Sequence, residues 1–288
     1  MKALAFGEVL WDVYPESKHL GGATMNFAAH VKRCGGDAWI VTAVGEDPLG
    51  RETVDEITRL GIRADYVTRS KKETGKCVVT LDENKIPSYA LLDDVAYDDI
   101  RTPSAKGERF DVLYFGTLAL RNANNRFVIE EILKQNAFGH RFVDVNIRPP
   151  FYSAEVVRFA LENATVVKIS DEELPTVMDV LGKECGTVES CAEALSEDFD
   201  GLKLVLITRG EKGAFVYDVK ERAHYECGAE RVEVVSTVGA GDSFSASFLV
   251  KYFETRDIPS ALSFASRVSA FVVSREGAIP DYAPSDFE

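Results

Sequence analysis

The sequence predicts one α/β domain in which helices cover both faces of a mostly parallel sheet. Two observations support this prediction. Short apolar runs rich in β-branched residues alternate with segments of helical period along the 288 residues. No linker rich in Pro or Gly, internal repeat or low-complexity tract divides the chain. We therefore expect a single domain that spans residues 1–288.

The expected strands are apolar runs of the kind buried on both faces of a sheet. They cover residues 38–44, 112–115, 141–145, 165–169 and 202–208. Segments with apolar residues three or four positions apart lie between them and predict helices at 25–34, 49–60, 125–134 and 154–161. Because helices separate most of the strands, the order indicates parallel strand pairs.

Residues 75–92 depart from this order. Two strand-like runs flank the polar stretch Asp82-Glu83-Asn84-Lys85, with no helix between them. We interpret them as a β flap beside the main sheet. Such a flap can exclude water from a site of phosphoryl transfer, although an ordinary edge hairpin has the same pattern.

Charge and composition exclude several classes of protein. The formal net charge of -14 disfavours nucleic-acid binding, since no basic patch offsets it. Five scattered cysteines without a Cys-x-x-Cys pattern argue against a disulfide framework or a zinc site. We find neither a signal-peptide pattern nor a membrane-spanning run, so we expect a cytoplasmic protein with no membrane partner.

The strongest chemical signal begins at Ser236. Gly239, Ala240 and Gly241 precede an apolar stripe typical of a helix that begins around Asp242. Unpaired amides and the helix dipole at such a tip suit a phosphate group in transfer. Asp242 could accept the proton of an attacking hydroxyl there, or could simply cap the helix.

Two other glycine clusters lie beside expected strands or helices. Thr208, Gly210 and Gly213 follow a buried strand, at the end where open α/β sheets bind ligands, although a plain turn also fits. Gly21 and Gly22 precede a helix and would let backbone approach a ligand.

Four polar side chains complete the candidate site. Asn26 and Asp12 suit sugar hydroxyls, although Asp12 could equally be a solvated loop residue. Arg148, at the end of a predicted strand, could pair with a phosphate. Glu173 could hold Mg²⁺ through water or could serve only as part of an acidic first helical turn.

These motifs, in this order, resemble the ribokinase-like (PfkB-type) carbohydrate kinases over nearly the whole chain. The resemblance rests on three runs: Gly21-Gly22-Ala23-Thr24-Met25-Asn26, Thr208-Arg209-Gly210-Glu211-Lys212-Gly213 and Thr237-Val238-Gly239-Ala240-Gly241-Asp242. It implies a ribokinase-like fold with a small β lid, which we expect from segments 10–22 and 66–100. It also implies ATP and Mg²⁺ as cofactors and a sugar as the acceptor of the γ-phosphate.

Within that family the sequence is most similar to bacterial fructokinases, on motifs such as Gly7-Glu8-Val9-Leu10-Trp11-Asp12 and Asn146-Ile147-Arg148-Pro149-Pro150-Phe151-Tyr152. This similarity implies phosphorylation of fructose at O6. Ribose, 2-keto-3-deoxygluconate and adenosine remain alternative substrates, and a non-catalytic sugar or nucleotide sensor on the same fold is an alternative function.

The resemblance also assigns roles to residues by motif position. Asp242, Gly239, Ala240, Gly241 and Arg148 become catalytic. Asp12, Gly21, Gly22, Asn26, Arg148 and Asp242 become sugar contacts, and Thr208, Gly210, Gly213, Gly239 and Gly241 become nucleotide contacts.

Two positions differ from the family pattern. Ser236 replaces the Asp that is a ligand of a monovalent cation, so potassium dependence is in question. Val238, Arg275 and Gly277 could still form a weaker site with Ser236. Ser170 replaces the Asn of an Asn-x-x-Glu motif that ends at Glu173, which implies looser metal binding.

The apolar face of the expected flap implies one protein partner, a second copy of the chain. Val78, Val79, Tyr89 and Leu91 suggest that two lids pair to form a homodimer.

Overall fold

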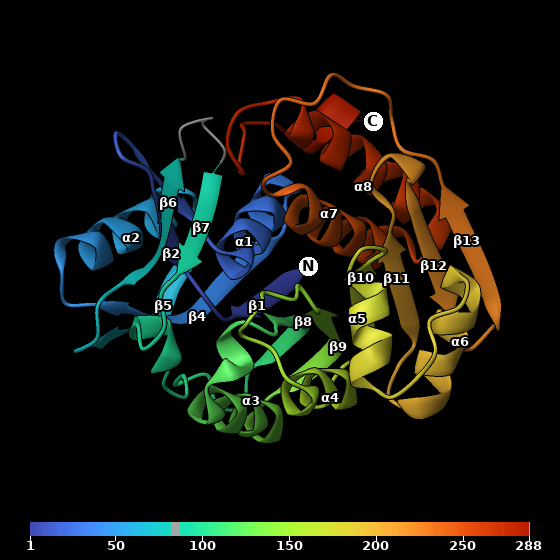
Figure 1. The fold of residues 1–288 in the computed structure, drawn as a ribbon, viewed down its shortest axis with the longest axis horizontal. Coiled ribbons are helices and arrows are strands. Elements are labelled where there is room, and N and C mark those ends of the chain that lie inside the picture. Colours follow the sequence, from blue (N-terminus) through green and yellow to red (C-terminus); the bar gives the residue numbers. More distant parts are fainter. Residues whose placement is uncertain (82–86, 288) are drawn as a thin grey trace.

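The computed structural model describes residues 1–81 and 87–287 (Figure 1). A nine-stranded sheet forms its centre, in the order β13-β12-β11-β10-β9-β8-β1-β4-β5. Every neighbouring pair is parallel except β11 with β12 and β12 with β13. The strands are β1 (Lys2–Phe6), β4 (Asp37–Gly45), β5 (Arg63–Ser70), β8 (Arg109–Gly116), β9 (Ala137–Asp144), β10 (Val166–Ser170), β11 (Leu204–Thr208), β12 (Ala214–Asp218) and β13 (Ala223–Cys227).

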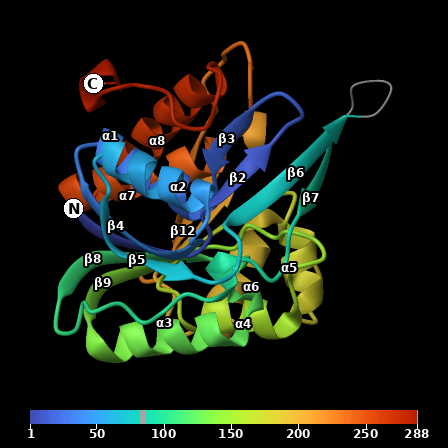
Figure 2. The ribbon, with the colours of Figure 1, turned by 90° about the vertical axis from the view of Figure 1, so that its left-hand side faces the viewer.

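Helices cover both faces of this sheet, as the turned view in Figure 2 shows. One layer contains α1 (Ala23–Arg33), α2 (Pro48–Arg59), α7 (Ala240–Thr255) and α8 (Ile258–Val273). The other contains α3 (Ala123–Gln135), α4 (Ala154–Glu162), α5 (Leu174–Val180) and α6 (Val188–Asp198). Short 3-10 helices lie at η1 (Ala96–Asp98), η2 (Ala119–Arg121), η3 (Gly210–Lys212) and η4 (Pro284–Phe287). The predicted fold class is confirmed.

The two layers have separate apolar cores because side chains alternate across a strand. In β1, Leu4 and Phe6 pack with the α3–α6 layer, whereas Ala3 and Ala5 pack with the α1, α7 and α8 layer. All four side chains are completely buried. Burial on both faces explains why this strand and its neighbours are apolar at nearly every position.

A second, four-stranded sheet, here called the small sheet, has the order β3-β2-β6-β7. Its strands are β2 (Leu10–Val13), β3 (Lys18–Gly21), β6 (Gly75–Leu81) and β7 (Pro87–Leu91). β6 and β7 pair antiparallel, as predicted, and Figure 2 shows them projecting from the α/β body. The predicted turn at Asp82-Glu83-Asn84-Lys85 lies outside the described residues.

Asp47 connects the small sheet to the main sheet through hydrogen bonds of its carboxylate. Its carboxylate caps α2 by accepting a hydrogen bond from Gly50 N–H at 2.8 Å. The same carboxylate accepts hydrogen bonds from the N–H and the hydroxyl of Thr74, directly before β6. Asp47 therefore has a structural role in this chain.

Two predicted positions need correction. The alternative in which Asp12 is a solvated loop residue is wrong, because Asp12 belongs to β2 of the small sheet, within the segment 10–22 expected to contribute to the lid. Arg148 does not end a strand, because β9 stops at Asp144 and Asn146 adopts a φ of 42°, which extended backbone cannot have. Arg148 therefore lies in an exposed loop. Among the described residues, no helix has both the length and the apolar character needed to cross a bilayer.

Candidate active site

The candidate residues gather where the parallel strands end. Glu8 follows β1, Arg148 follows β9, Glu173 follows β10 and Thr208 ends β11. Carboxyl ends of parallel strands lie along one edge of a sheet, so these loops share an edge. The topology thus brings together residues that are far apart in the sequence.

The N-terminal tip of α7 faces this edge. Gly239 precedes the helix with a φ of 80°, and no side chain in the described part of the chain caps the helix. The N–H groups of Gly241 and Asp242 donate no hydrogen bond within residues 1–81 and 87–287. Two bare amides and the positive end of a sixteen-residue helix form an anion cradle, here defined as Gly239, Ala240 and Gly241. Asp242 does not cap the helix, so that alternative is wrong.

A backbone contact requires glycine at position 239, and a buried side chain leaves little room for a Cβ at position 241. A Cβ on Gly239 would lie 2.6 Å from the carbonyl oxygen of Ala278, closer than van der Waals contact permits. A Cβ on Gly241 would lie 2.9 Å from Nζ of Lys168. Ala278 and Lys168 therefore both pack against the N-terminal tip of α7.

Among the described residues, Asp242 has one hydrogen-bond partner, Asn26 of α1, whose Nδ2 donates to Oδ2 at 2.8 Å. Burial raises the pKa of Asp242 to about 6, and the negative charge of Asp144 contributes in the same direction. The hydrogen bond from Asn26 and the positive charges of Lys168 and Arg148 oppose this rise. Asp242 is thus mostly ionised at pH 7 and basic enough to accept a proton.

A buried ion pair lies behind this carboxylate. Nζ of Lys168, on β10, lies 3.0 and 3.1 Å from the two carboxylate oxygens of Asp144, on β9. The hydroxyl of Ser245, on α7, donates to the same carboxylate at 3.3 Å. The pair therefore ties the main sheet to the helix that carries the cradle.

Glu8 is a residue of the site that the sequence analysis did not identify as functional. Its side chain is 2% exposed, and Oε2 has no hydrogen-bond partner among the described residues. Burial raises the pKa of Glu8 to about 7, and the charge of Asp242 also raises it, whereas Arg148 lowers it. Glu8 stands in the run Gly7-Glu8-Val9-Leu10-Trp11-Asp12 that is similar to fructokinases, but the burial of its carboxylate is not visible in sequence.

The pKa of Glu8 predicts a pH-dependent stability. Because the folded-state pKa exceeds the unfolded value, the folded protein binds an extra proton between pH 4.5 and 7 and loses stability as the pH rises through that range. We expect Glu8→Gln to abolish this loss, on the order of 2–3 kcal/mol between pH 5 and pH 8. Urea unfolding at both pH values measures it. The exposed Glu162→Gln serves as the control, and an identical pH dependence in Glu8→Gln and wild type would refute the prediction.

Of the predicted sugar contacts, Asn26 meets Asp242 directly, whereas Asp12, Gly21 and Gly22 pack against one another and against Glu8. Oδ2 of Asp12 lies 3.0 Å from where a Cβ on Gly21 would be, and a Cβ on Gly22 would lie 2.7 Å from the carbonyl oxygen of Glu8. Burial raises the pKa of Asp12, and the charge of Arg148 lowers it. The positive charge of Arg148 thus lowers the pKa of Asp12, Glu8 and Asp242 alike.

The predicted nucleotide loop is a tight connection between antiparallel strands. The Arg209 N–H donates to the Gly213 carbonyl at 2.8 Å, and Gly210 to Lys212 form η3. A Cβ on Gly213 would lie 1.9 Å from the carbonyl oxygen of Cys227, so packing alone requires that glycine. Gly210 has a φ of 52°, and a Cβ there would meet no atom of the described residues within 4 Å, so the space beside it is open.

The predicted metal residues fall into two groups. The Glu173 carboxylate accepts hydrogen bonds from Ile147 N–H at 2.7 Å and from the N–H and hydroxyl of Ser170 at 2.9 Å each. It therefore joins the loops that follow β9 and β10. In the second group, Ser236 Oγ accepts from Val238 N–H at 3.3 Å, while Arg275 and Gly277 are exposed in the segment after α8.

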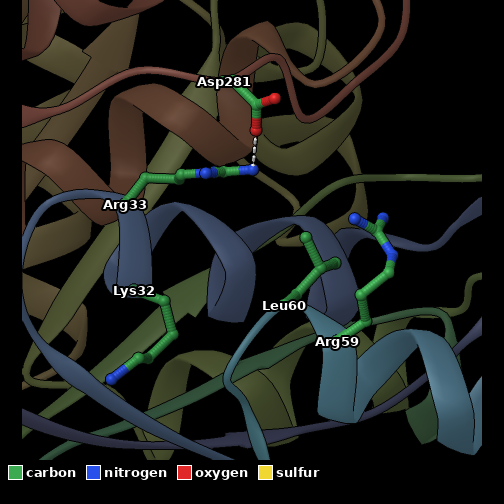
Figure 3. A pocket seen from close by; sticks show the side chains of 5 residues that line it. All are labelled: Lys32, Arg33, Arg59, Leu60 and Asp281. Atoms are coloured by element: carbon green, nitrogen blue, oxygen red, sulfur yellow. Dashed lines mark hydrogen bonds and ion pairs between the residues drawn. The ribbon is translucent and has the colours of Figure 1, made fainter.

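A separate cavity lies outside this site, at the carboxyl ends of α1 and α2 (Figure 3). Lys32, Arg33, Arg59, Leu60 and Asp281 line it, and Figure 3 shows Arg33 paired with Asp281. None of the predicted site residues lines this cavity.

Comparison with known proteins identifies one family. The family model described as pfkB family carbohydrate kinase matches residues 4–285. A fructokinase of Solanum tuberosum is 29% identical over 308 aligned positions, which cover 96% of this chain and 91% of the relative.

Solved structures share the fold. A fructokinase from Xylella fastidiosa with bound ATP has a TM-score of 0.85 at 24% identity, with 98% of this chain and 95% of that chain covered. An uncharacterized sugar kinase from Pyrococcus horikoshii in complex with ATP has a TM-score of 0.81 at 25% identity, with 99% and 96% covered.

Proposed function

The chain belongs to the pfkB family of carbohydrate kinases, and from this premise we propose that it transfers the γ-phosphate of ATP to fructose, forming fructose 6-phosphate. Its family makes it a phosphotransferase that acts on a sugar hydroxyl. Fructose is favoured by the potato relative, which is named a fructokinase.

The observation that carries the proposal is the placement of Asp242 beside the anion cradle, where Asn26 holds it at 2.8 Å. When bound, ATP supplies the phosphoryl group. The bare amides of Gly241 and Asp242 fit its negative oxygens, and Arg148 adds a positive charge. Asp242 accepts the proton of the sugar hydroxyl as that oxygen attacks. Asn26 orients the carboxylate, and Asp12, Gly21 and Gly22 contact the sugar.

A panel of acceptors tests the substrate. ADP release is measured with fructose, ribose, 2-keto-3-deoxygluconate and adenosine. We expect fructose to give the highest kcat/KM, and preference for another acceptor would keep the kinase assignment but replace the substrate. Calorimetric sugar binding without any ADP release would instead favour the sensor hypothesis, against which the intact cradle and Asp242 argue.

The pKa of Asp242 predicts the pH dependence of the reaction. Proton acceptance requires the ionised carboxylate, so we expect kcat/KM for the sugar to fall about tenfold per pH unit below an apparent pKa near 6. Steady-state rates between pH 5 and pH 8 check this. A flat profile over that range would exclude Asp242 as the base.

Metal use is part of the proposal. Glu173 would bind a water ligand of Mg²⁺, and the open Gly210 and Thr208 would contact the nucleotide. We propose at most weak potassium activation, through Ser236, Val238, Arg275 and Gly277, since Ser236 offers a neutral hydroxyl. Assays in potassium and in tetramethylammonium salts test this, and strong activation by potassium would contradict it.

We also propose a cytoplasmic homodimer that pairs through the small sheet. All five cysteines are free, as in a reducing compartment. Leu91 is partly exposed on β7, whereas the side chains of Val79 and Tyr89 are not among those that the structure describes. Light scattering at micromolar concentration tests the dimer, and a monomeric mass would exclude it.

A further inference from the structure

His30 lies completely buried on α1, and the proposed mechanism does not use it. Its Nε2 lies 2.9 Å from the carbonyl oxygen of Ala278, and its Nδ1 lies 2.7 Å from the hydroxyl of Tyr282. A carbonyl can only accept, so Nε2 carries the proton and Nδ1 accepts from Tyr282. Both ring nitrogens are therefore satisfied in the neutral form, which agrees with the lowering of the His30 pKa to about 4 by burial.

These two hydrogen bonds hold the tail segment, defined as residues 278–282, against α1. Tyr282 is 8% exposed, and its hydroxyl also lies 3.7 Å from Sγ of the buried Cys34. Arg33 pairs with Asp281 on the outside of the same segment (Figure 3). The interior contact to His30 is the one that fixes a backbone carbonyl of the tail segment.

The carbonyl of Ala278 also packs against Gly239 of the anion cradle. The position of a Cβ on Gly239 would be 2.6 Å from the Ala278 oxygen and 2.9 Å from its Cα. The cradle backbone is thus packed directly on the residue that His30 holds. A shift of Ala278 would change how the amides of the α7 tip are presented.

The same helix holds the proposed base. Asn26 and His30 are four residues apart on α1, so their side chains lie on one face of the helix, one turn apart. Asn26 donates to Asp242, and His30 donates to Ala278. Helix α1 therefore holds both the proposed base, Asp242, and Ala278, the residue that packs against the cradle.

We propose that His30 is a positioning residue for phosphoryl transfer. It fixes the tail segment on α1, and the tail segment in turn keeps the cradle at Gly239 in its position beside Asp242. This proposal rests on the proposed function. Reacting groups tolerate little misplacement, so loss of the His30 hydrogen bond should reduce kcat more than sugar binding.

Three substitutions of His30 distinguish the contributions of the hydrogen bonds at its two ring nitrogens. Gln places an amide nitrogen the same number of bonds from Cβ as Nε2, so His30→Gln keeps the donor to Ala278. His30→Asn reaches only as far as Nδ1 and loses that donor. His30→Phe keeps a ring but loses both hydrogen bonds.

We expect His30→Phe and His30→Asn to lower kcat about tenfold or more with little change in KM for the sugar, and His30→Gln to stay within about threefold of wild type. Arg33→Gln breaks only the surface pair to the tail segment and should leave kcat within about twofold. Circular dichroism checks that each variant is folded. If His30→Phe does not fold, the test is the difference in kcat between His30→Asn and His30→Gln.

Two results would overturn the positioning role. One is a folded His30→Asn with wild-type kcat, and the other is equal losses in His30→Gln, His30→Asn and Arg33→Gln. A wild-type chain without turnover on any sugar would instead overturn the proposed function. In that case the affinity of each variant for ATP is measured by calorimetry in place of kcat. We expect His30→Phe and His30→Asn to bind ATP more weakly than His30→Gln and Arg33→Gln.

Discussion

Asp242→Asn should lower kcat by about 10²- to 10⁴-fold while ATP affinity stays close to that of wild type. Asn has the same shape and can still accept the hydrogen bond from Asn26, so the geometry survives and proton acceptance does not. The raised pKa of Asp242 also means that its charge destabilises the fold above pH 6. We therefore expect a variant that is much slower but at least as stable at pH 8, as measured by turnover and urea unfolding.

Asp12→Asn is the matched control for this experiment. Asp12 lies on the small sheet and is proposed to bind sugar hydroxyls without taking the proton. Its replacement should raise KM for the sugar and change kcat far less. Normal turnover in Asp242→Asn, or equal kcat losses in both variants, would remove Asp242 from its role as base.

Lys168→Met should destabilise the protein by about 3–5 kcal/mol, because it leaves the carboxylate of Asp144 buried without its cation. The Lys168 and Asp144 side chains are 8% and 2% exposed, so water cannot replace the lost partner. Asp144→Asn leaves the ammonium unpaired and should also destabilise. The double variant should lose less stability than the sum of the two single variants, as denaturant unfolding will measure.

The same pair predicts opposite changes in the reaction. Lys168 lowers the pKa of Asp242, and Asp144 raises it. Lys168→Met should therefore move the acidic limb of the kcat/KM profile to higher pH, and Asp144→Asn should move it to lower pH. Shifts in the same direction would show that the pair does not act on Asp242 electrostatically.

The sequence alone determined the fold class and the central part of the site. Alternation of apolar strands with helical periods predicted the parallel sheet, because that pattern is local and each strand is buried on both faces. Gly239 and Gly241 before an apolar helical stripe likewise predicted the α7 tip, since φ preference and helix period are properties of neighbouring residues.

Only the tertiary structure showed which distant residues support that tip. Asn26 meets Asp242 across 216 positions, and His30 meets Ala278 across 248. Neither separation leaves a periodic signal, because both contacts arise from how α1 packs against α7 and against the segment after α8. The same limit applies to Glu8, whose raised pKa comes from burial by elements that are remote in sequence. Local residue patterns thus predicted the helices, the strands and the cradle, whereas the environment of each charge depends on packing between elements that are distant in sequence.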